Sequence, residues 1–173
     1  MNTTLFFLRS SEQKIAYNML PYALCLENIT DIPLSNIYSA HYGLKSTDIG
    51  IYSLSNNEVS GAAWIRLFKE SDGASGFLDD LTPILTIGVM PDARGMGIGF
   101  LIMEQLLQEA AVMYDQISVS VQSNSRAVKF FGRLGFVPLI DSELNDVLIM
   151  VKKLEKKEVI RPVDGYDPRR WMD

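Results

Sequence analysis

One stretch of the chain, Pro83 to Phe100, constrains its fold more than any other. It reads PILTIGVMPDARGMGIGF. The apolar residues from Ile84 to Met90 predict a buried strand, and the residues Pro91 to Ala93 that follow are typical of a turn. From Gly97 onward the apolar residues recur at helical spacing, at Leu101, Ile102, Leu106, Ala110 and Met113. A strand is therefore expected to pass into a helix through a short glycine-rich loop.

The loop between this strand and this helix predicts an anion-binding site. Arg94 leads into it, and glycines follow at positions 95, 97 and 99. The first turn of a helix leaves backbone N–H groups unpaired and carries the positive end of the helix dipole. Glycines also remove the Cβ atoms that would keep a phosphate away. A turn that only reverses the chain is the simpler alternative, but three alternating glycines after an arginine favour binding.

Two common phosphate-binding motifs do not fit the loop. A Walker loop requires a lysine after its second glycine, and Phe100, five residues after Gly95, is followed by none. A dinucleotide fingerprint requires a third glycine where Phe100 stands. The pattern that fits is Arg-x-x-Gly-x-Gly, formed by Arg94, Gly97 and Gly99. In this motif the chain resembles the GNAT superfamily of N-acetyltransferases, whose loop of this form holds the pyrophosphate of acetyl-CoA.

A second motif supports the resemblance. The fifth strand of that family ends at an asparagine and leads into Ala-x-x-x-Tyr-x-x-x-Gly-Phe, and Asn124, Ala127, Gly135 and Phe136 take those places. The resemblance implies an α/β (α+β) fold with a mixed, mostly antiparallel seven-stranded sheet. About four helices would flank this sheet, which would be splayed between its fourth and fifth strands. We expect one such domain over residues 1–152 and a charged C-terminal tail over residues 153–173.

Hydrophobic periodicity and turn residues predict the other elements. Before the glycine loop they predict a strand at 4–9, a helix up to Leu26 with a kink or a second short helix at Pro21, a helix at 32–42, a hairpin of 48–54 and 59–68, and a mobile loop at 69–83. After it they predict a strand at 117–121, a short helix at 127–134 and a strand pair of 137–140 and 147–152.

The resemblance also implies how acetyl-CoA would be held. The pantetheine arm would lie between the splayed strands and pair with the backbone of Ile87, Gly88 and Val89. The pyrophosphate would contact the amides of Arg94, Gly95, Met96, Gly97, Ile98 and Gly99. The pantetheine and acetyl end would contact Asn124, Ala127 and Phe131.

Two positions depart from the family pattern. Many members carry a glutamate base on the fourth strand, where this chain has Ile84, and a tyrosine acid in the second motif, where it has Phe131. The remaining candidates for acid–base chemistry are Asp80, Thr86 acting through a water chain, and His41.

Each other candidate side chain has a structural alternative. The pair Asp79 and Asp80 could attract a cationic acceptor, or simply form a solvated acidic loop. His41 could pack beside Tyr38 and Tyr42. Trp64 and Arg66 share one face of a strand and could line an acceptor pocket, although Trp64 is more often a core residue.

Composition limits the class of protein. The chain has 173 residues, 47% of them hydrophobic, and 16 Lys and Arg against 21 Asp and Glu. This size suits one domain, and the acidic balance argues against a nucleic-acid footprint spread over the surface. The single cysteine, Cys25, cannot form an internal disulfide, and the apolar patch from Leu5 to Leu8 has no basic region before it. We therefore expect a cytoplasmic protein with no membrane partner.

These features together predict an N-acetyltransferase. It would move an acetyl group from acetyl-CoA to a primary amine of a small molecule or peptide, by direct attack in a ternary complex. We expect no metal, no nucleic-acid partner, and a monomer or homodimer. Ile84 and Phe131 motivate the main alternative, a catalytically weak or inactive regulatory protein that binds CoA or acyl-CoA. A nucleotide-binding regulatory domain is a third possibility.

Overall fold

The fold is described here from a computed structural model for residues 2–23, 32–139 and 146–156. The first half of this part of the chain contains β1 (Thr3–Phe7), α1 (Gln13–Ala23), β2 (Ile49–Ser55), β3 (Glu58–Arg66) and β4 (Ile84–Val89). The second half contains α2 (Ile98–Met113), β5 (Gln116–Gln122), α3 (Ala127–Arg133), β6 (Val137–Pro138) and β7 (Val147–Lys153). Short 3-10 turns at Ser10–Glu12, Glu70–Asp72 and Pro91–Ala93 connect some of them.

The strands of the described residues form one seven-stranded sheet in the order β1-β2-β3-β4-β5-β7-β6. Every neighbouring pair is antiparallel except β4 and β5, which run parallel. The hairpin between β2 and β3 turns at Asn56 and Asn57, which have φ values of 53° and 66°. Asparagine is among the few non-glycine residues that tolerate this left-handed region, so the predicted turn forms where the sequence places it. The mixed sheet expected from the sequence is thus confirmed.

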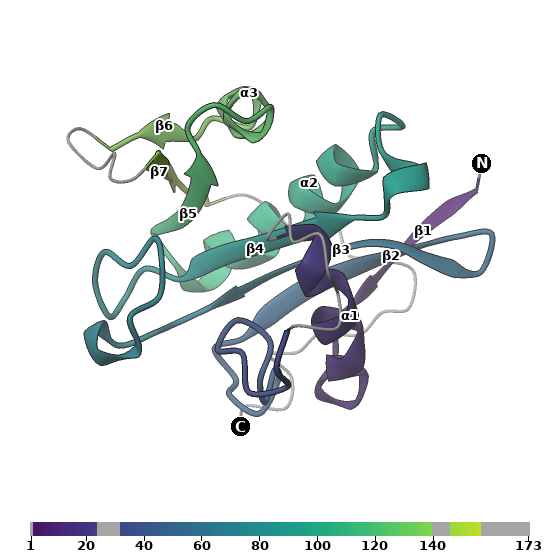
Figure 1. Ribbon diagram of the computed structural model, residues 1–173, viewed down its shortest axis with the longest axis horizontal. Helices are drawn as coiled ribbons and strands as arrows, with labels where there is room; N and C mark the ends of the chain where they lie inside the picture. The colour runs from purple at the N-terminus through teal and green to yellow at the C-terminus, as the bar shows by residue number, and fades with distance from the viewer. Residues whose placement is uncertain (1, 24–31, 140–145, 157–173) are drawn as a thin grey trace.

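The parallel strands β4 and β5 meet only at one end. Their register contains a single pair, Ile84 with Ser118, and the Ser118 N–H donates to the Pro83 carbonyl at 3.1 Å. Beyond this pair β5 diverges from β4 toward α3 (Figure 1). The other edge of β5 pairs with β7 along its whole length. The predicted splay between the fourth and fifth strands is therefore present, and among the described residues it leaves most of one edge of β4 without a neighbouring strand.

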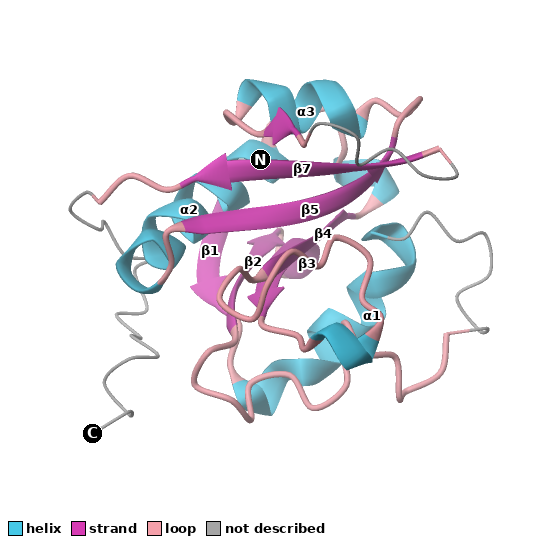
Figure 2. Ribbon diagram, turned by 90° about the vertical axis from the view of Figure 1, so that its left-hand side faces the viewer, coloured by secondary structure: helices cyan, strands magenta, loops and turns pink. Residues whose placement is uncertain are grey.

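Helices cover both faces of the sheet. Helix α2 packs on one face with Ile98, Ile102 and Leu106 in the main hydrophobic core, which also contains residues of β2 to β5 and Phe131 of α3. Helix α1 lies on the opposite face, where Met19 and Leu20 join a core around Trp64 (Figure 2). A Cβ at Gly88 would lie 2.7 Å from the Met19 carbonyl oxygen, so glycine is needed there to let α1 approach β4.

The helix predicted at residues 32–42 is wrong, because this segment forms consecutive turns. His41 has a φ of 56°, which no right-handed helix allows. The backbone carbonyls there are used by side chains of β3 instead of by a helical ladder. The Arg66 guanidinium donates to the carbonyls of Ile37 and Ala40 at 3.0 and 2.7 Å, and Trp64 Nε1 donates to the Tyr38 carbonyl at 2.7 Å. The described residues therefore contain three α-helices, where the sequence led us to expect about four.

Other expectations meet the limits of the described residues. Helix α1 continues two residues beyond Pro21, and the rest of the predicted helix, including Cys25, lies outside the described part. The same holds for the tail after residue 156. No helix within residues 2–23, 32–139 and 146–156 is long and apolar enough to cross a membrane, and these ranges contain no cluster of three or more His, Cys, Asp or Glu side chains that could hold a metal ion.

Candidate functional site

The glycine loop has an open cradle at the start of α2. Gly95 and Gly97 have φ values of 76° and 80°, and Gly97 is the N-cap residue directly before α2, which no side chain caps. No atom of the described chain lies within 4 Å of a Cβ built on either glycine. The first N–H groups of α2 therefore face space that a phosphate could enter. This geometry fits the anion site predicted from the sequence.

The splayed edge of β4 runs into the cradle. Met90 donates its N–H to the Ser60 carbonyl of β3 at 2.9 Å. Because successive residues of a strand direct their backbone groups to opposite sides, those of Ile87 and Val89 point away from β3, toward the gap. The Val89 carbonyl accepts a hydrogen bond from Arg94 Nε at 3.0 Å, which ties the arginine to this edge. Ile87 and Val89 thus lie where an extended arm could pair, whereas Gly88 turns its backbone toward β3 and serves the packing of α1.

Helix α3 approaches the cradle from the other side of the gap. The Phe130 ring packs edge-on against Phe100 with 5.0 Å between ring centroids, and a Cβ at Gly99 would lie 3.2 Å from the Phe130 ring. Gly99 therefore allows the close contact between α2 and α3. Asn124 is exposed in the turn before α3, and Ala127 is half-buried at its first position. The Ser125 hydroxyl between them is shielded from solvent and has no hydrogen-bond partner.

The two departures from the family pattern lie in apolar surroundings. Ile84 is 3% exposed and packs with Phe68 and Ala74. Phe131 is 3% exposed and packs edge-on against Phe130 and Phe136, at centroid distances of 5.1 and 5.2 Å. Neither position offers a proton acceptor or donor, so acid–base groups for any reaction must come from elsewhere.

Asp79 and Asp80 lie on an exposed turn before β4. Asp79 Oδ1 accepts hydrogen bonds from the N–H groups of Leu81 and Thr82, at 2.9 and 2.8 Å. The bond from Leu81, followed by bonds from Thr82, lowers the pKa of Asp79. One member of the acidic pair is therefore used to shape the turn, and only Asp80 remains as a candidate for substrate contact.

Replacing Asp79 by alanine should lower the free energy of unfolding at pH 7 by about 0.5 kcal/mol, a low value for a capping carboxylate because the site is exposed. The folded-state pKa lies below the unfolded one, so this stabilisation is present above the unfolded value of about 3.9 and is lost as pH falls through the folded value. Urea unfolding at about pH 7 and pH 3 tests this, with Asp80→Ala as the matched control. Equal losses in the two variants at pH 7 would contradict it.

The remaining candidates from the sequence are placed apart from one another. His41 is exposed on its turn, which does not favour the alternative that it packs beside Tyr38 and Tyr42. Thr86 is 8% exposed and lies opposite Trp64 in the sheet register. Trp64 is fully buried and belongs to the core beneath α1. Arg66, also buried, pairs with Asp48 at 3.2 Å. Trp64 and Arg66 therefore hold the turn segment in place and do not line an open pocket.

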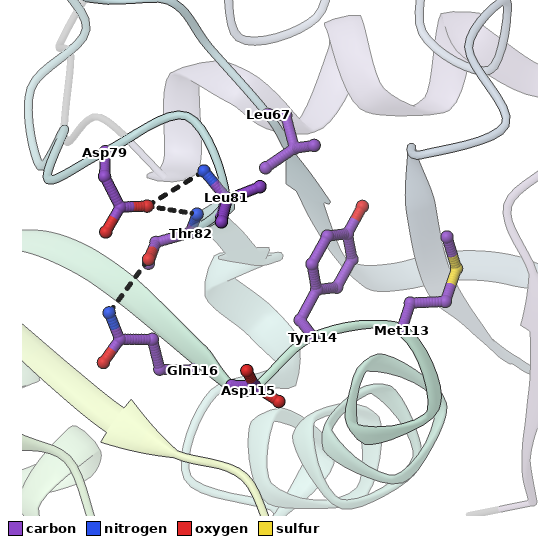
Figure 3. Close-up of a pocket in the computed structure, with 8 residues that line it drawn as sticks. All are labelled: Leu67, Asp79, Leu81, Thr82, Met113, Tyr114, Asp115 and Gln116. Atoms are coloured by element: carbon purple, nitrogen blue, oxygen red, sulfur yellow. Dashed lines mark hydrogen bonds between the residues drawn. The ribbon is translucent and has the colours of Figure 1, made fainter.

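A pocket of about 470 Å³ lies at the opposite ends of β4 and β5 from the glycine loop (Figure 3). The Tyr114 hydroxyl there donates to the Thr47 carbonyl at 2.6 Å. Burial, and to a smaller extent the Asp48 carboxylate, raises the pKa of Tyr114 to about 12, so it remains a neutral donor. None of the residues predicted to hold acetyl-CoA lines this pocket, which is formed by Leu67, Asp79, Leu81, Thr82, Met113, Tyr114, Asp115 and Gln116.

Little in the sequence indicates which residues close the inner end of the gap, the end at which Ile84 pairs with Ser118. Tyr38, Ser75, Gly76 and Ser120 converge there through hydrogen bonds between three distant segments. The one available signal was the alternation along Gln116–Gln122, which places Ser118 and Ser120 on the face opposite the main core.

The chain is similar to known acetyltransferases. A family model described as an acetyltransferase (GNAT) domain matches residues 67–157, about half of the chain. A search of curated proteins finds no match.

Solved structures share the fold at low sequence identity. An acetyltransferase from Streptococcus agalactiae is 19% identical with a TM-score of 0.64, and the match covers 88% of this chain and 98% of that one. A ribosomal-protein alanine N-acetyltransferase from Escherichia coli is 17% identical with a TM-score of 0.62, covering 96% and 100%. A phosphinothricin acetyltransferase from Sinorhizobium meliloti, solved in complex with acetyl-CoA, is 16% identical with a TM-score of 0.62, covering 95% of each chain.

Proposed function

The chain belongs to the GNAT acetyltransferase family, and we propose that it is an N-acetyltransferase that moves an acetyl group from acetyl-CoA to a primary amine of a small molecule or peptide. The observation that carries this proposal is the open cradle at Gly95 and Gly97, placed where the free edge of β4 ends. A cytoplasmic location and a monomer or homodimer are part of the proposal. The proposed location rests on the single cysteine.

Acetyl-CoA would be held by backbone groups more than by side chains. The N–H groups of residues 95–99 and the Arg94 guanidinium suit a pyrophosphate, because both supply positive potential at a helix start. The backbone of Ile87 and Val89 suits the amides of the pantetheine arm. Asn124, Ala127 and the unpartnered Ser125 hydroxyl would contact the same arm from the β5 side.

The reaction needs a neutral amine next to the thioester. The amine nitrogen forms a bond to the carbonyl carbon, the C–S bond breaks, and the proton lost by nitrogen ends on the thiol or in solvent. Positioned acid–base groups contribute about 10²–10⁴-fold to such a step, whereas holding the reactants in line contributes roughly 7–11 kcal/mol. Ile84 and Phe131 therefore make transfer slower without preventing it.

Without a protein base, the rate should follow the ionisation of the acceptor. A lysine side chain with a pKa of about 10.4 is neutral in only about one molecule in a thousand at pH 7.4, whereas an α-amine near 8 loses far less. With acetyl-CoA saturating, we expect kcat/KM for the amine to rise about tenfold per pH unit up to the pKa of each acceptor. A break at the same pH for all acceptors would show that a protein group titrates instead.

The assay for this prediction also tests the function. Release of the CoA thiol is measured with a thiol-reactive dye for a panel of primary amines, with the N-acetylated form of each amine as its matched control. We expect thiol release that depends on the free amine.

The alternative function, a CoA-binding regulatory protein, is motivated by the apolar surroundings of Ile84 and Phe131. Tight CoA binding without amine-dependent thiol release across a broad panel would favour it over the proposed transferase.

A further inference from the structure

A short loop segment closes the inner end of the gap between β4 and β5. We call residues 74–76 the plug. Gly76 lies between the two strands: a Cβ built on it would be 3.4 Å from the Ser120 nitrogen and 3.6 Å from Ile84 Cγ2. Its φ of 94° is one that L side chains rarely adopt. The plug thus fills the space that opens just beyond the last paired residues, Ile84 and Ser118.

Hydrogen bonds hold the plug to two other segments. Ser118 Oγ donates to the Gly76 carbonyl at 2.7 Å, and the hydroxyls of Ser75 and Ser120 are 2.5 Å apart. From the opposite side, the Ser75 N–H donates to the Tyr38 hydroxyl at 2.8 Å. The plug is therefore fixed both to β5 and to the turn segment that covers the α1 face.

An apolar cluster supports the plug from behind. Ala74 packs with Phe68 and Ile84, and all three are less than a tenth exposed. The Tyr38 ring packs edge-on against Phe68 with 5.7 Å between centroids. Moving the plug outward would break both the hydrogen bonds and these contacts, so the inner end of the gap has a firm wall.

The length of β4 brings the acyl end of a CoA thioester to this wall. The cradle lies at the Val89 end of the strand and the plug at the Ile84 end. Five residue steps of about 3.3 Å separate them, or roughly 16 Å. An arm that starts at the cradle and follows the free edge of β4 therefore points its thioester toward the plug.

We infer that the plug limits the length of the acyl group, so that acetyl is accepted while butyryl and longer chains are excluded. This inference rests on the proposed function, because it takes the gap to be the site of the pantetheine arm. Each additional methylene would have to displace the plug or remain folded in the gap. One unaccommodated methylene costs about tenfold or more in selectivity.

The test is equilibrium binding by isothermal titration calorimetry with CoA, acetyl-CoA, butyryl-CoA and hexanoyl-CoA. The wild-type protein should bind CoA and acetyl-CoA with similar affinity, and butyryl-CoA at least about tenfold more weakly. The double variant Ser118→Ala/Ser120→Ala removes both hydroxyls that hold the plug to β5. In this variant the affinities for acetyl-CoA and butyryl-CoA should differ by about threefold or less, and the affinity for acetyl-CoA should stay at the wild-type value. If the double variant does not fold, Ser120→Ala alone replaces it in the test. It should also reduce the discrimination between acetyl-CoA and butyryl-CoA, by a smaller factor.

The control is Thr3→Val, which removes the Thr3–Ser55 hydroxyl contact at the far edge of the sheet and should leave the discrimination unchanged. Equal wild-type affinity for acetyl-CoA and butyryl-CoA would show that the plug does not limit the acyl group, and it would leave the proposed function standing. Full discrimination in the folded serine variants would contradict the inference as well. If CoA itself does not bind, the proposed function fails and this inference fails with it.

Discussion

Replacing Gly97 by valine is expected to weaken CoA binding about 100-fold. The new side chain would enter the open space above the start of α2, where the pyrophosphate must approach the backbone N–H groups. Charge-assisted hydrogen bonds of this kind contribute about 1.5–3 kcal/mol each, and losing one or two of them corresponds to about two orders of magnitude in affinity. Calorimetric titration with CoA measures the effect directly.

Backbone strain must be separated from the loss of the cradle. Gly97 has a φ of 80°, so valine also strains the folded state by about 1–3 kcal/mol. Gly73 provides a matched control, since its φ is 66° and no described atom lies within 4 Å of a Cβ built on it. Gly73→Val should lose similar stability and retain CoA affinity. Unchanged affinity in a folded Gly97→Val protein would refute the cradle.

The second large effect concerns Ile84, the position at which many family members carry a glutamate. Ile84→Glu should destabilise the protein by about 3–5 kcal/mol at neutral pH, because the carboxylate would be buried against Phe68 and Ala74, opposite an Arg66 whose guanidinium is already paired with Asp48. We therefore expect this substitution to give no gain in acetyl transfer, although it restores the usual residue of the family.

The pH dependence of Ile84→Glu distinguishes burial of charge from loss of packing. Burial raises the folded-state pKa of the new glutamate above its unfolded value of about 4.3. Its stability is then highest below the unfolded pKa and falls as pH rises through the folded pKa. Ile84→Gln has the same shape without ionisation, so its free energy of unfolding should not show this fall. Parallel profiles for the two variants, measured by urea unfolding, would mean that the side chain reaches water.

The sequence predicted the central strand, the glycine loop and α2 closely. A buried apolar strand that gives way to helical periodicity through glycines has few other solutions, and Gly97 is the N-cap of the helix, which begins at Ile98. The segment at residues 32–42 was predicted wrongly because its helical composition could not reveal that Arg66 and Trp64 would use its carbonyls. Contacts between residues 26 to 29 positions apart leave no trace in local periodicity.

The sequence also does not show which neighbours approach the glycines and aspartates of the candidate site. Gly88 and Gly99 were both expected to hold the cofactor, and the structure shows in addition that Gly88 accommodates α1 and Gly99 accommodates Phe130. A glycine in the sequence shows only that a Cβ is absent, and what approaches it is decided by packing. The same reasoning applies to Asp79, whose carboxylate serves its own turn.

The sequence by itself therefore determined the family, the sheet and the glycine loop that precedes α2, because these depend on local backbone preferences and on short motifs. Only the tertiary structure decided how the gap between β4 and β5 ends. The plug joins Tyr38, Ser75 and Ser120 across 37 and 45 residues of sequence. Its effect on the acyl group follows from where these segments meet in space, which no single segment encodes.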